Sequence, residues 1–336
     1  MSAPPIRARG GRLLDQLLSG GALLAAYIAL AVFVALTDPK FFHATNLKNM
    51  LVQNTALALV AVGMTFVIIG RNYDLSVGAI AGLSGVLFAK LTIEHSILVG
   101  AIVAVLVATA CGVVNGFIVA KLRVNSFMAT FATGLVFSGL ALNYQGPRQI
   151  SVSAPHFDAI GLAKWGPIPE PIVLIVVAFV VGAIVLERTP FGQNVYAVGS
   201  NREAARLIGL PVDRTVVATF AVSGFMAGVA GLILASQLGL GSADSGSSLP
   251  IEAIAAVVVG GISVYGGEGR IWRAALGGLI LATLNNVFVG LSWSTETQNV
   301  AEGVVILLAL GANRLVRTSS GSARSPVASG PAAGPA

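Results

Sequence analysis

Long apolar runs follow one another along this chain, and they restrict its fold more than any other feature of the sequence. Runs of about 17 to 25 residues can each cross a hydrocarbon layer of roughly 30 Å as an α-helix. Ten are present: 17–37, 51–70, 75–92, 97–120, 126–143, 171–187, 216–236, 249–264, 272–291 and 297–313. Two of them, 75–92 and 249–264, are short and rich in small residues, which predicts broken or re-entrant helices. We therefore expect an all-α, polytopic transmembrane bundle of about ten spans.

The composition points to a membrane protein and argues against several other classes. Hydrophobic residues make up 55% of the 336 residues and charged residues 10%, whereas soluble domains have roughly 25% charged residues. The single cysteine, Cys111, lies within an apolar run, so neither a disulfide framework nor a metal cluster is expected. HExxH and GxSxG patterns are absent, and Gly261-x4-Gly266 lacks the Lys and Ser/Thr of a Walker A loop. We therefore expect a protein that is not an enzyme and holds no metal or cofactor itself.

The basic residues predict how the chain is oriented. The formal net charge is +6, but the arginines sit at the ends of apolar runs, where membrane topology explains them without a nucleic acid partner. With a cytoplasmic N-terminus, five of the 20 Lys and Arg residues fall outside and the rest inside. Those five are Lys40, Lys48, Lys90, Arg148 and Lys164. Because cytoplasmic loops carry the excess of basic residues, this orientation and an even number of spans are favoured.

The same orientation divides the chain into three parts. Residues 1–16 form a cytoplasmic N-terminal segment, and residues 17–313 form the transmembrane domain, with a cytoplasmic loop at 188–215. Residues 314–336 are rich in Ser, Pro, Gly and Ala, which predicts a disordered cytoplasmic tail.

A short polar helix interrupts the apolar pattern at residues 192–214, GQNVYAVGSNREAARLIGLPVDR. Ser200 can act as its N-cap with Glu203 three positions later, which is a capping-box pattern, and Gly209 can supply the left-handed position after the helix. The predicted helix then covers about eight residues, 201–208, and such a short helix is marginal in water on its own. Two interpretations remain: a helix that rests on the lipid surface, or one that docks in a groove of another protein.

Small residues repeat at helical spacing in two of the apolar runs. One ladder is Ala108, Gly112, Gly116 and Ala120, and the other is Ala274, Gly278 and Ala282, continued by Asn286. Faces of small residues let helix backbones approach closely in lipid. We therefore expect both ladders to be helix-packing faces, and they do not by themselves indicate a pore.

Polar residues are few in the apolar runs, and they are the candidates for a transport path. The candidates are Gln53, Asn54, Asp74, Ser76, Asn115, Asn285 and Asn286. Carboxamides can hydrogen-bond sugar hydroxyls, but they can equally join one helix to another, and both interpretations stay open. As a set, they suit a neutral polar solute better than an ion.

The carboxylates near the spans argue against an ion-driven carrier. Asp74, Glu252 and Glu302 all lie close to the ends of predicted spans, whereas a proton- or sodium-driven carrier is expected to place a carboxylate near the midplane. Asp74 is instead expected to cap the helix that begins near Leu75 and to interact with its positive end.

Four ordered segments carry a resemblance to a known family. They are AVGMTFVIIGRNYDLSVGAIAGLSG, GVVNGFIVAKLRVNSFMATFAT, GQNVYAVGSNREAARLIGLPVDR and IEAIAAVVVGGISVYGGEGRIW. Together they resemble the ribose-type, monosaccharide permeases of bacterial ABC importers, over roughly residues 45 to 313. The chain departs from the family at Arg71, Asn72 and Tyr73, where two glycines and an isoleucine are common, and near Leu249, where an aromatic residue is common.

The resemblance implies a location, partners and a coupling site. It implies a multi-pass protein of the bacterial inner membrane, in which two permease copies, or a copy and a paralogue, form the pathway. A separate cytoplasmic ATPase subunit would bind ATP and Mg²⁺, and a soluble binding protein would deliver the sugar. The ATPase-coupling segment would be carried by Gly199, Asn201, Glu203, Ala204, Ala205, Arg206 and Gly209, and the family's DLSVG segment by Asp74 to Gly78.

Two other functions stay open at this point. One is the permease of a related branched-chain amino-acid ABC importer, and the other is a stand-alone secondary carrier. An amino-acid substrate would be expected to need a charged or helix-dipole site in the path, and the sequence shows no strong one.

Overall fold

The computed structural model describes residues 8–37, 41–294, 296–298, 300–301, 303–305 and 307, without the side chains of residues 8–20, 22 and 37. The helices are α1 (Ala8–Thr37), α2 (Ala44–Gln53), α3 (Thr55–Ile69), α4 (Val77–Glu94), α5 (Ile97–Lys121), α6 (Ser126–Gln145), α7 (Ala159–Leu162), α8 (Glu170–Arg188), α9 (Pro190–Ser200), α10 (Arg202–Leu207), α11 (Val212–Leu238), α12 (Leu249–Val259) and α13 (Ile271–Gly290). The strands are β1 (Ile150–Ser151), β2 (Lys164–Trp165), β3 (Ile168–Pro169) and β4 (Leu240–Gly241), paired antiparallel as β1–β4 and β2–β3.

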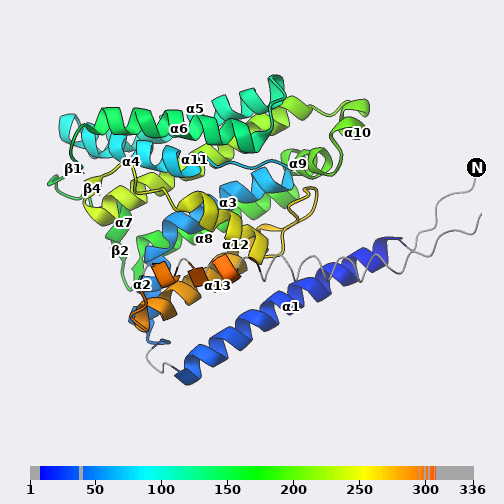
Figure 1. Ribbon diagram of the computed structural model, residues 1–336, viewed down its shortest axis with the longest axis horizontal. Helices are drawn as coiled ribbons and strands as arrows, with labels where there is room; N and C mark the ends of the chain where they lie inside the picture. The colour runs from blue at the N-terminus through cyan, green and yellow to red at the C-terminus, as the bar shows by residue number, and fades with distance from the viewer. Residues whose placement is uncertain are drawn as a thin grey trace, which may run out of the picture.

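The helices from α2 onward form one bundle whose two ends differ, and α1 runs obliquely beside it (Figure 1). The end that carries α9 and α10, called the α10 end below, lies on the right of the view. The end that carries β1, β4 and α7, called the far end, lies on the left. α11 packs against α5, α3 and α4, so it forms the centre of the bundle.

The prediction of a polytopic helical bundle is confirmed. Within the described part of the chain, six helices are long and apolar enough to cross a membrane: α4, α5, α6, α8, α11 and α13. The pair α2 and α3, bent by 52°, is apolar enough to form either a seventh, broken span or a re-entrant loop. The bend is at Asn54, the single residue between the two helices, and the sequence reading did not anticipate it.

The two spans expected to be broken behave differently. α4 is a continuous helix of 18 residues, so the expected break within 75–92 is wrong, and the interruption lies just before the helix, at residues 70–76. α12 has 11 residues and is too short to span alone, as expected for 249–264. Of the predicted span 297–313, only 297–298, 300–301, 303–305 and 307 are described, so that span stays a prediction. Residues 1–7 and the tail 314–336 lie outside the described residues.

The first ladder of small residues is confirmed as a packing face. A methyl group at Gly112 would meet the carbonyl of Phe220, and one at Gly116 would lie 2.6 Å from Cα of Val217. Ala108 and Ala120 are buried along the same side of α5. The contact between α5 and α11 therefore depends on residues that have no side chain to separate the two backbones.

The prediction of the second ladder is wrong at one position, because Gly277 and not Gly278 makes the close contact. In α13, Gly278 has nothing within 4 Å of its added methyl position, whereas the neighbouring Gly277 lies against the carbonyl of Ala256 in α12. Ala274 and Ala282 are buried as expected. A helix has 3.6 residues per turn, so its buried face alternates steps of three and four, and a strict step of four drifts off it.

Two crossings are interrupted by non-helical chain. After α3, residues 70–76 turn back along α6, where the amides of Tyr73 and Leu75 donate to Ser126 Oγ and Thr130 Oγ1, both at 3.0 Å. The chain then continues into α4. This segment is mostly buried, so its hydrogen bonds to α6 replace those that a helix would supply internally.

The second interrupted crossing enters from the far end. After α11, residues 239–248 run from the far end toward the α10 end beside α4, where the carbonyl of Ala243 packs against Gly82. A methyl group at Gly78 would lie 2.9 Å from Cδ of Pro250, in the first turn of α12. The first turns of α4 and α12 therefore lie side by side inside the bundle, which is the kind of discontinuous geometry that transporters use for substrate sites.

Candidate functional site

The start of α10 differs from the predicted capping box. Asn201 is the N-cap, and its Oδ1 accepts from the amide of Ala204 at 3.0 Å. Ser200 is instead the last residue of α9, and its hydroxyl donates to the carbonyl of Tyr196 at 2.8 Å. The Ser200–Glu203 capping box is therefore wrong, because α9 continues through Ser200 and leaves the next residue to begin α10. The helix is also shorter than expected, with six residues.

The end of α10 is as predicted. Gly209 has φ +80°, and its amide donates to the carbonyl of Arg206 at 3.0 Å. The amide of Leu210 donates to the carbonyl of Ala205, also at 3.0 Å. This pair of bonds is the Schellman motif, which needs a left-handed residue after the helix and favours glycine there.

One face of α10 is fixed to the bundle and the other is open. Ala205 is buried and packs with Val212 of α11 and Val198 of α9. Leu207 and Ile208 are 88% and 74% exposed, and Ala204 and Glu203 are exposed as well. α10 lies at the edge of the bundle (Figure 1), and its exposed side chains are both apolar and charged.

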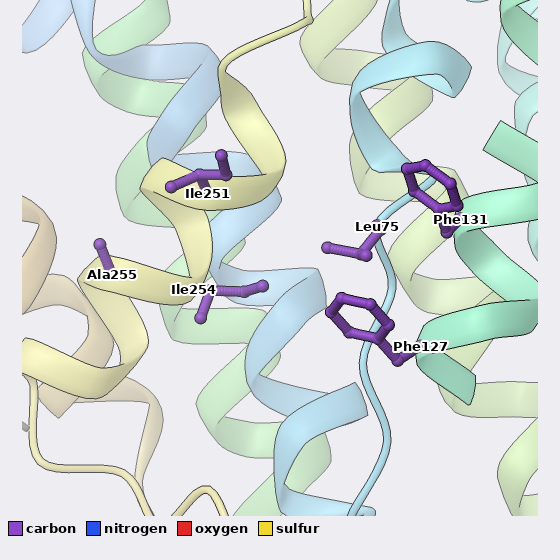
Figure 2. A pocket seen from close by; sticks show the side chains of 6 residues that line it. All are labelled: Leu75, Phe127, Phe131, Ile251, Ile254 and Ala255. Carbon is purple, nitrogen blue, oxygen red and sulfur yellow. The ribbon is translucent and has the colours of Figure 1, made fainter. Parts of the chain in front are cut away.

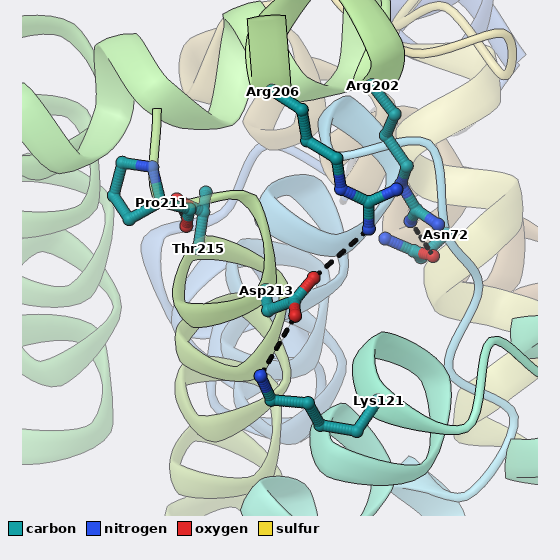
Figure 3. A network of polar contacts seen from close by, with 7 residues as sticks. All are labelled: Asn72, Lys121, Arg202, Arg206, Pro211, Asp213 and Thr215. Carbon is teal, nitrogen blue, oxygen red and sulfur yellow. Dashed lines mark hydrogen bonds and ion pairs between the residues drawn. The ribbon is translucent and has the colours of Figure 1, made fainter. Parts of the chain in front are cut away.

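Arg206 attaches α10 to its neighbours at the surface. Its Nη2 lies 3.1 Å from Oδ1 of Asp213 in α11, and Nζ of Lys121 in α5 lies 3.0 Å from Oδ2 of the same carboxylate (Figure 3). All three side chains are partly open to solvent, so each pair contributes roughly 0–1 kcal/mol. Because Arg206 is the member of this group that belongs to α10, its pair with Asp213 orients α10 more than it stabilises the fold, and Lys121 forms its ion pair with Asp213.

Arg202 connects α10 with the interior, and the sequence reading did not include it among the coupling residues. Its Nη2 donates to Oδ1 of Asn72 at 2.7 Å (Figure 3). Asn72 is 2% exposed, and its Nδ2 donates to the carbonyl of Gly70 at 3.0 Å. Burial, and then the charges of Arg206 and Arg71, lower the pKa of Arg202 from its ordinary value. No local pattern marks Arg202, because its partner is 130 residues away in the chain.

Gly199 allows α9 to lie against two loops at once. A methyl group there would collide with the carbonyl of Ile69 and would lie 2.8 Å from the amide of Gly267. That amide donates to the Ile69 carbonyl at 2.8 Å, and the hydroxyl of Tyr196 donates to the carbonyl of Gly269 at 2.8 Å. The α9–α10 segment therefore contacts the chain just before residues 70–76 and the chain just after α12.

Asp74 belongs to a buried polar cluster, not to a span end. Its Oδ1 accepts from the Ser76 hydroxyl at 2.6 Å and the Ser76 amide at 3.1 Å, and its Oδ2 accepts from the Ser223 hydroxyl at 2.8 Å. The bond to the Ser76 amide resembles a cap, but α4 begins only at Val77. Nδ2 of Asn115 donates to Ser76 Oγ at 2.6 Å, so the cluster joins residues 70–76 to α5 and α11.

The other candidate path residues lie elsewhere. Asn286 and Asn46 exchange hydrogen bonds of 3.0 and 3.3 Å, which join α13 to α2. Asn54 donates to the carbonyl of Met50 at 2.8 Å, Gln53 is exposed, and Asn285 is half-buried. The structure thus brings Asp74, Ser76 and Asn115 together and leaves the others in separate places. Among the described residues, no three His, Cys, Asp or Glu side chains are grouped as a metal site would require.

Comparison with known proteins agrees with the helical geometry. The family described as "branched-chain amino acid transport system / permease component" matches residues 46–310. The ribose import permease of Haemophilus influenzae is 39% identical over 87% of this chain and 92% of its own length. That of Bacillus subtilis is 38% identical over 86% and 91%, and the L-arabinose ABC transporter permease of Azospirillum brasilense is 36% identical over 91% and 90%. No solved structure matches. The chain therefore belongs to this family of ABC importer permeases, as the four sequence segments predicted.

Proposed function

We propose that the chain is the membrane-spanning subunit of an ATP-driven importer that moves a monosaccharide or similar polyol by alternating access. The observation that carries this proposal is the 39% identity to a ribose import permease over 87% of the chain. In this proposal a second copy or a paralogue completes the pathway, a separate subunit binds ATP and Mg²⁺ and hydrolyses the ATP, and a soluble protein delivers the sugar. The chain itself carries out no chemical step and holds no cofactor.

The α10 end is proposed to face the cytoplasm. Basic side chains gather there, among them Lys121, Arg202, Arg206 and Arg270, as cytoplasmic surfaces of membrane proteins favour. The protein then lies in a bacterial inner membrane with both termini in the cytoplasm.

α10 is proposed to be the site where the ATPase subunit docks. Its exposed Leu207 and Ile208 project from a helix whose other face is held by Ala205, and burying such a side chain contributes roughly 1.5–3 kcal/mol. The Schellman motif and the Arg206–Asp213 pair give the helix one orientation before any partner binds. The remaining coupling residues, Gly199, Asn201, Glu203, Ala204 and Gly209, shape or flank the same surface.

The contacts that join α9 and α10 to the bundle indicate how a movement of these helices is transmitted to the transport path. Arg202 is bonded to Asn72 at the start of the buried segment 70–76, and Gly199 packs against the loop that follows α12. A rigid movement of α9 and α10 would therefore displace both interrupted crossings together. Reversing the charge of Glu203 or Arg206 should uncouple ATP hydrolysis from uptake while the permease still inserts into the membrane; normal sugar accumulation would count against this lever.

The buried charges suit a neutral substrate better than an amino acid. Among the described residues, Asp74 is the one fully buried charged side chain, and both its oxygens already accept hydrogen bonds from Ser76 and Ser223. An amino acid would need both a free carboxylate for its ammonium group and a donor for its carboxylate. The family also bears the name of branched-chain amino acid permeases, so that substrate class is the second candidate.

One reconstitution tests these alternatives. The permease would be placed in liposomes with its ATPase and binding protein, and uptake of labelled D-ribose, L-arabinose and L-leucine would be followed with and without ATP. We expect ATP-dependent accumulation of a pentose and none of leucine. Accumulation of leucine would establish the amino-acid function, and uptake by the permease without the ATPase would establish a stand-alone carrier.

A further inference from the structure

Residues 242–248, Ser-Ala-Asp-Ser-Gly-Ser-Ser, combine an irregular backbone with exposed polar side chains. The segment consists of turns, in which the Ser247 amide donates to the Asp244 carbonyl and the Leu249 amide to the Gly246 carbonyl, both at 3.1 Å. Asp244, Ser247 and Ser248 are exposed. None of these residues was among the path candidates drawn from the sequence, because the segment lies between two apolar runs and reads as an ordinary surface loop.

A chain of contacts places this segment near the middle of the bundle. Ala108 lies near the midpoint of the 25-residue α5, and a methyl group at Gly228 of α11 would lie 2.6 Å from its Cβ. The Gly228 carbonyl accepts from the hydroxyl of Ser84 in α4 at 2.8 Å. Gly82, about half a turn along α4, packs against the Ala243 carbonyl. Residue 243 therefore lies at about the depth of the midpoint of α5, and the chain descends from there toward the α10 end.

The exposed side chains of the segment form one face with those of α12. Ser248 has helical angles, φ −80° and ψ −24°, and both it and Ile251, three residues later, are exposed. Asp244 lies in the turns just before them, and Ala255, one turn beyond Ile251, is buried. Steps of three and four place residues on the same side of a helical path. The polar side chains of this face lie nearer the far end of the bundle, and the apolar ones lie nearer the α10 end.

Lipid is a poor neighbour for such a face at this depth. A carboxylate facing the hydrocarbon core is costly, and irregular backbone is found at membrane depth only where protein buries it or where it lines a water-filled cavity. Asp244, Ser247 and Ser248 are exposed, so they are not buried within this chain. A water-filled cavity is the environment that satisfies both conditions.

An apolar pocket continues the same face toward the α10 end. It has a volume of about 400 Å³ and is lined by Leu75, Phe127, Phe131, Ile251, Ile254 and Ala255. Figure 2 shows the three α12 residues on one side and Leu75 with the two phenylalanines of α6 on the other. A constriction lined only by apolar groups can exclude water and solutes until its walls move apart.

We infer that Asp244, Ser247 and Ser248 form a binding site for the hydroxyl groups of the transported sugar, and that the apolar pocket below them is the inner gate of the path. The inference rests on the proposed function and deepens it. An ionised carboxylate accepts from two neighbouring hydroxyls, and each serine hydroxyl both donates and accepts. This chemistry recognises a neutral polyol without requiring a charge on the substrate.

The first experiment tests whether water reaches the face that carries Asp244, Ser247 and Ser248. Asp244→Cys, Ser247→Cys and Ser248→Cys would be made in a Cys111→Ala background and treated, in the assembled importer, with a charged, membrane-impermeant thiol reagent. The matched control is Leu106→Cys, which lies two residues from Ala108 and is 63% exposed on α5. We expect reaction at the three polar positions and none at residue 106, because thiolate forms in water and not in lipid.

The second experiment asks whether the face binds sugar. Asp244→Ala and the double variant Ser247→Ala with Ser248→Ala should lower ATP-driven uptake of the transported pentose about tenfold. ATP hydrolysis stimulated by the loaded binding protein should persist, because α10 is unchanged. Asp244→Asn retains one acceptor and should retain more uptake than Asp244→Ala, and bound pentose should slow labelling of Ser248→Cys.

The remaining outcomes each overturn a stated part. Labelling no faster than at residue 106 would show that the face is not in a water-filled path. Disulfide cross-links between two copies at Ser248→Cys, without labelling, would show an interface between copies in its place. Labelling with unchanged uptake in Asp244→Ala would show a wet face that does not bind sugar. Uptake of leucine by the unaltered importer would refute the proposed function but leave the labelling result intact.

Discussion

The buried segment 70–76 and the exposed helix α10 are joined by one hydrogen bond, yet they have opposite energetic roles. In the segment, the Asp74 carboxylate and Asn72 are almost completely enclosed, and their hydrogen bonds have no water to replace them. On α10, Glu203 and Arg206 face solvent, and so do the apolar side chains of Leu207 and Ile208. The comparison indicates that the interior holds the permease together, whereas α10 is built for a partner. Substitutions should therefore separate into effects on the permease's own stability and effects on coupling.

The largest loss of stability is expected at Asp74. Asp74→Ala removes the acceptor of three hydrogen bonds and leaves the Ser76 and Ser223 hydroxyls without it, which should lower the free energy of unfolding by about 3 kcal/mol. Thermal unfolding in detergent measures the change. Asp74→Asn keeps one acceptor and should cost less. A melting temperature equal to that of the unaltered protein for Asp74→Ala would show that the cluster contributes nothing to stability.

A second interior effect is expected at Gly277, with its neighbour as the control. Gly277→Ala forces a methyl group against the Ala256 carbonyl, and overpacking of this kind costs about 1–3 kcal/mol. Gly278→Ala meets nothing within 4 Å and should be neutral or stabilising by up to about 1 kcal/mol, because alanine favours helices. The same unfolding assay compares them. Equal melting temperatures would contradict the close contact of α12 and α13.

Loss of the Arg202–Asn72 hydrogen bond, which joins α10 to residues 70–76, should affect coupling more than stability. Arg202→Ala and Asn72→Ala should each cost about 1 kcal/mol of stability and lower the sugar imported per ATP about fivefold or more. Their double variant should be no worse than Asn72→Ala alone, because Asn72→Ala already removes the bond to Arg202, together with its own bond to the Gly70 carbonyl. Asn72→Asp keeps the acceptor for Arg202 and should retain coupling.

The matched control for the Arg202 and Asn72 variants is Lys121→Ala, which removes an exposed ion pair at the same end of the bundle. It should change neither the stability nor the sugar imported per ATP measurably. Additive losses in the Arg202 and Asn72 variants would show that the two residues act separately. A failure of Arg202→Ala to retain the ATPase during purification would show that Arg202 serves docking, not transmission.

The smallest effect on the permease itself is expected at the tip of α10. Leu207→Ser combined with Ile208→Ser should change its stability by no more than about 0.5 kcal/mol, because both side chains are exposed. Co-purification of the ATPase should nevertheless be lost. A lower melting temperature with the ATPase still bound would reverse the assignment and make α10 a structural element or a lipid-surface helix.

Local patterns in the sequence were sufficient for several parts of the structure. Apolar runs predicted the crossing helices, the ladder from Ala108 to Ala120 predicted a helix-packing face on α5, and Gly209 predicted the end of α10. Each depends on hydropathy or on hydrogen bonds within one or two helical turns. Such features remain the same whatever the rest of the chain does.

Other features required the tertiary structure. Ser200 has the chemistry of an N-cap, but α9 packs against the loops at Ile69 and Gly267 and extends through that residue, so Asn201 takes the role. In the same way, Asp74 reads as a residue at the end of a span. It is enclosed in the structure because residues 70–76 turn back along α6.

Depth in the membrane is the property that the sequence alone determined least. Asp244 reads as a loop residue, and it lies beside the first half of α4 because Gly78 and Gly82 let residues 242–248 pack closely against that helix. The role of Arg202 likewise depends on its hydrogen bond to Asn72, which is 130 residues away in the chain. Hydropathy decided which segments enter the bilayer. Close contacts between distant glycines and carbonyls decided how deep the polar residues lie and which of them meet, because only the packed bundle sets those distances.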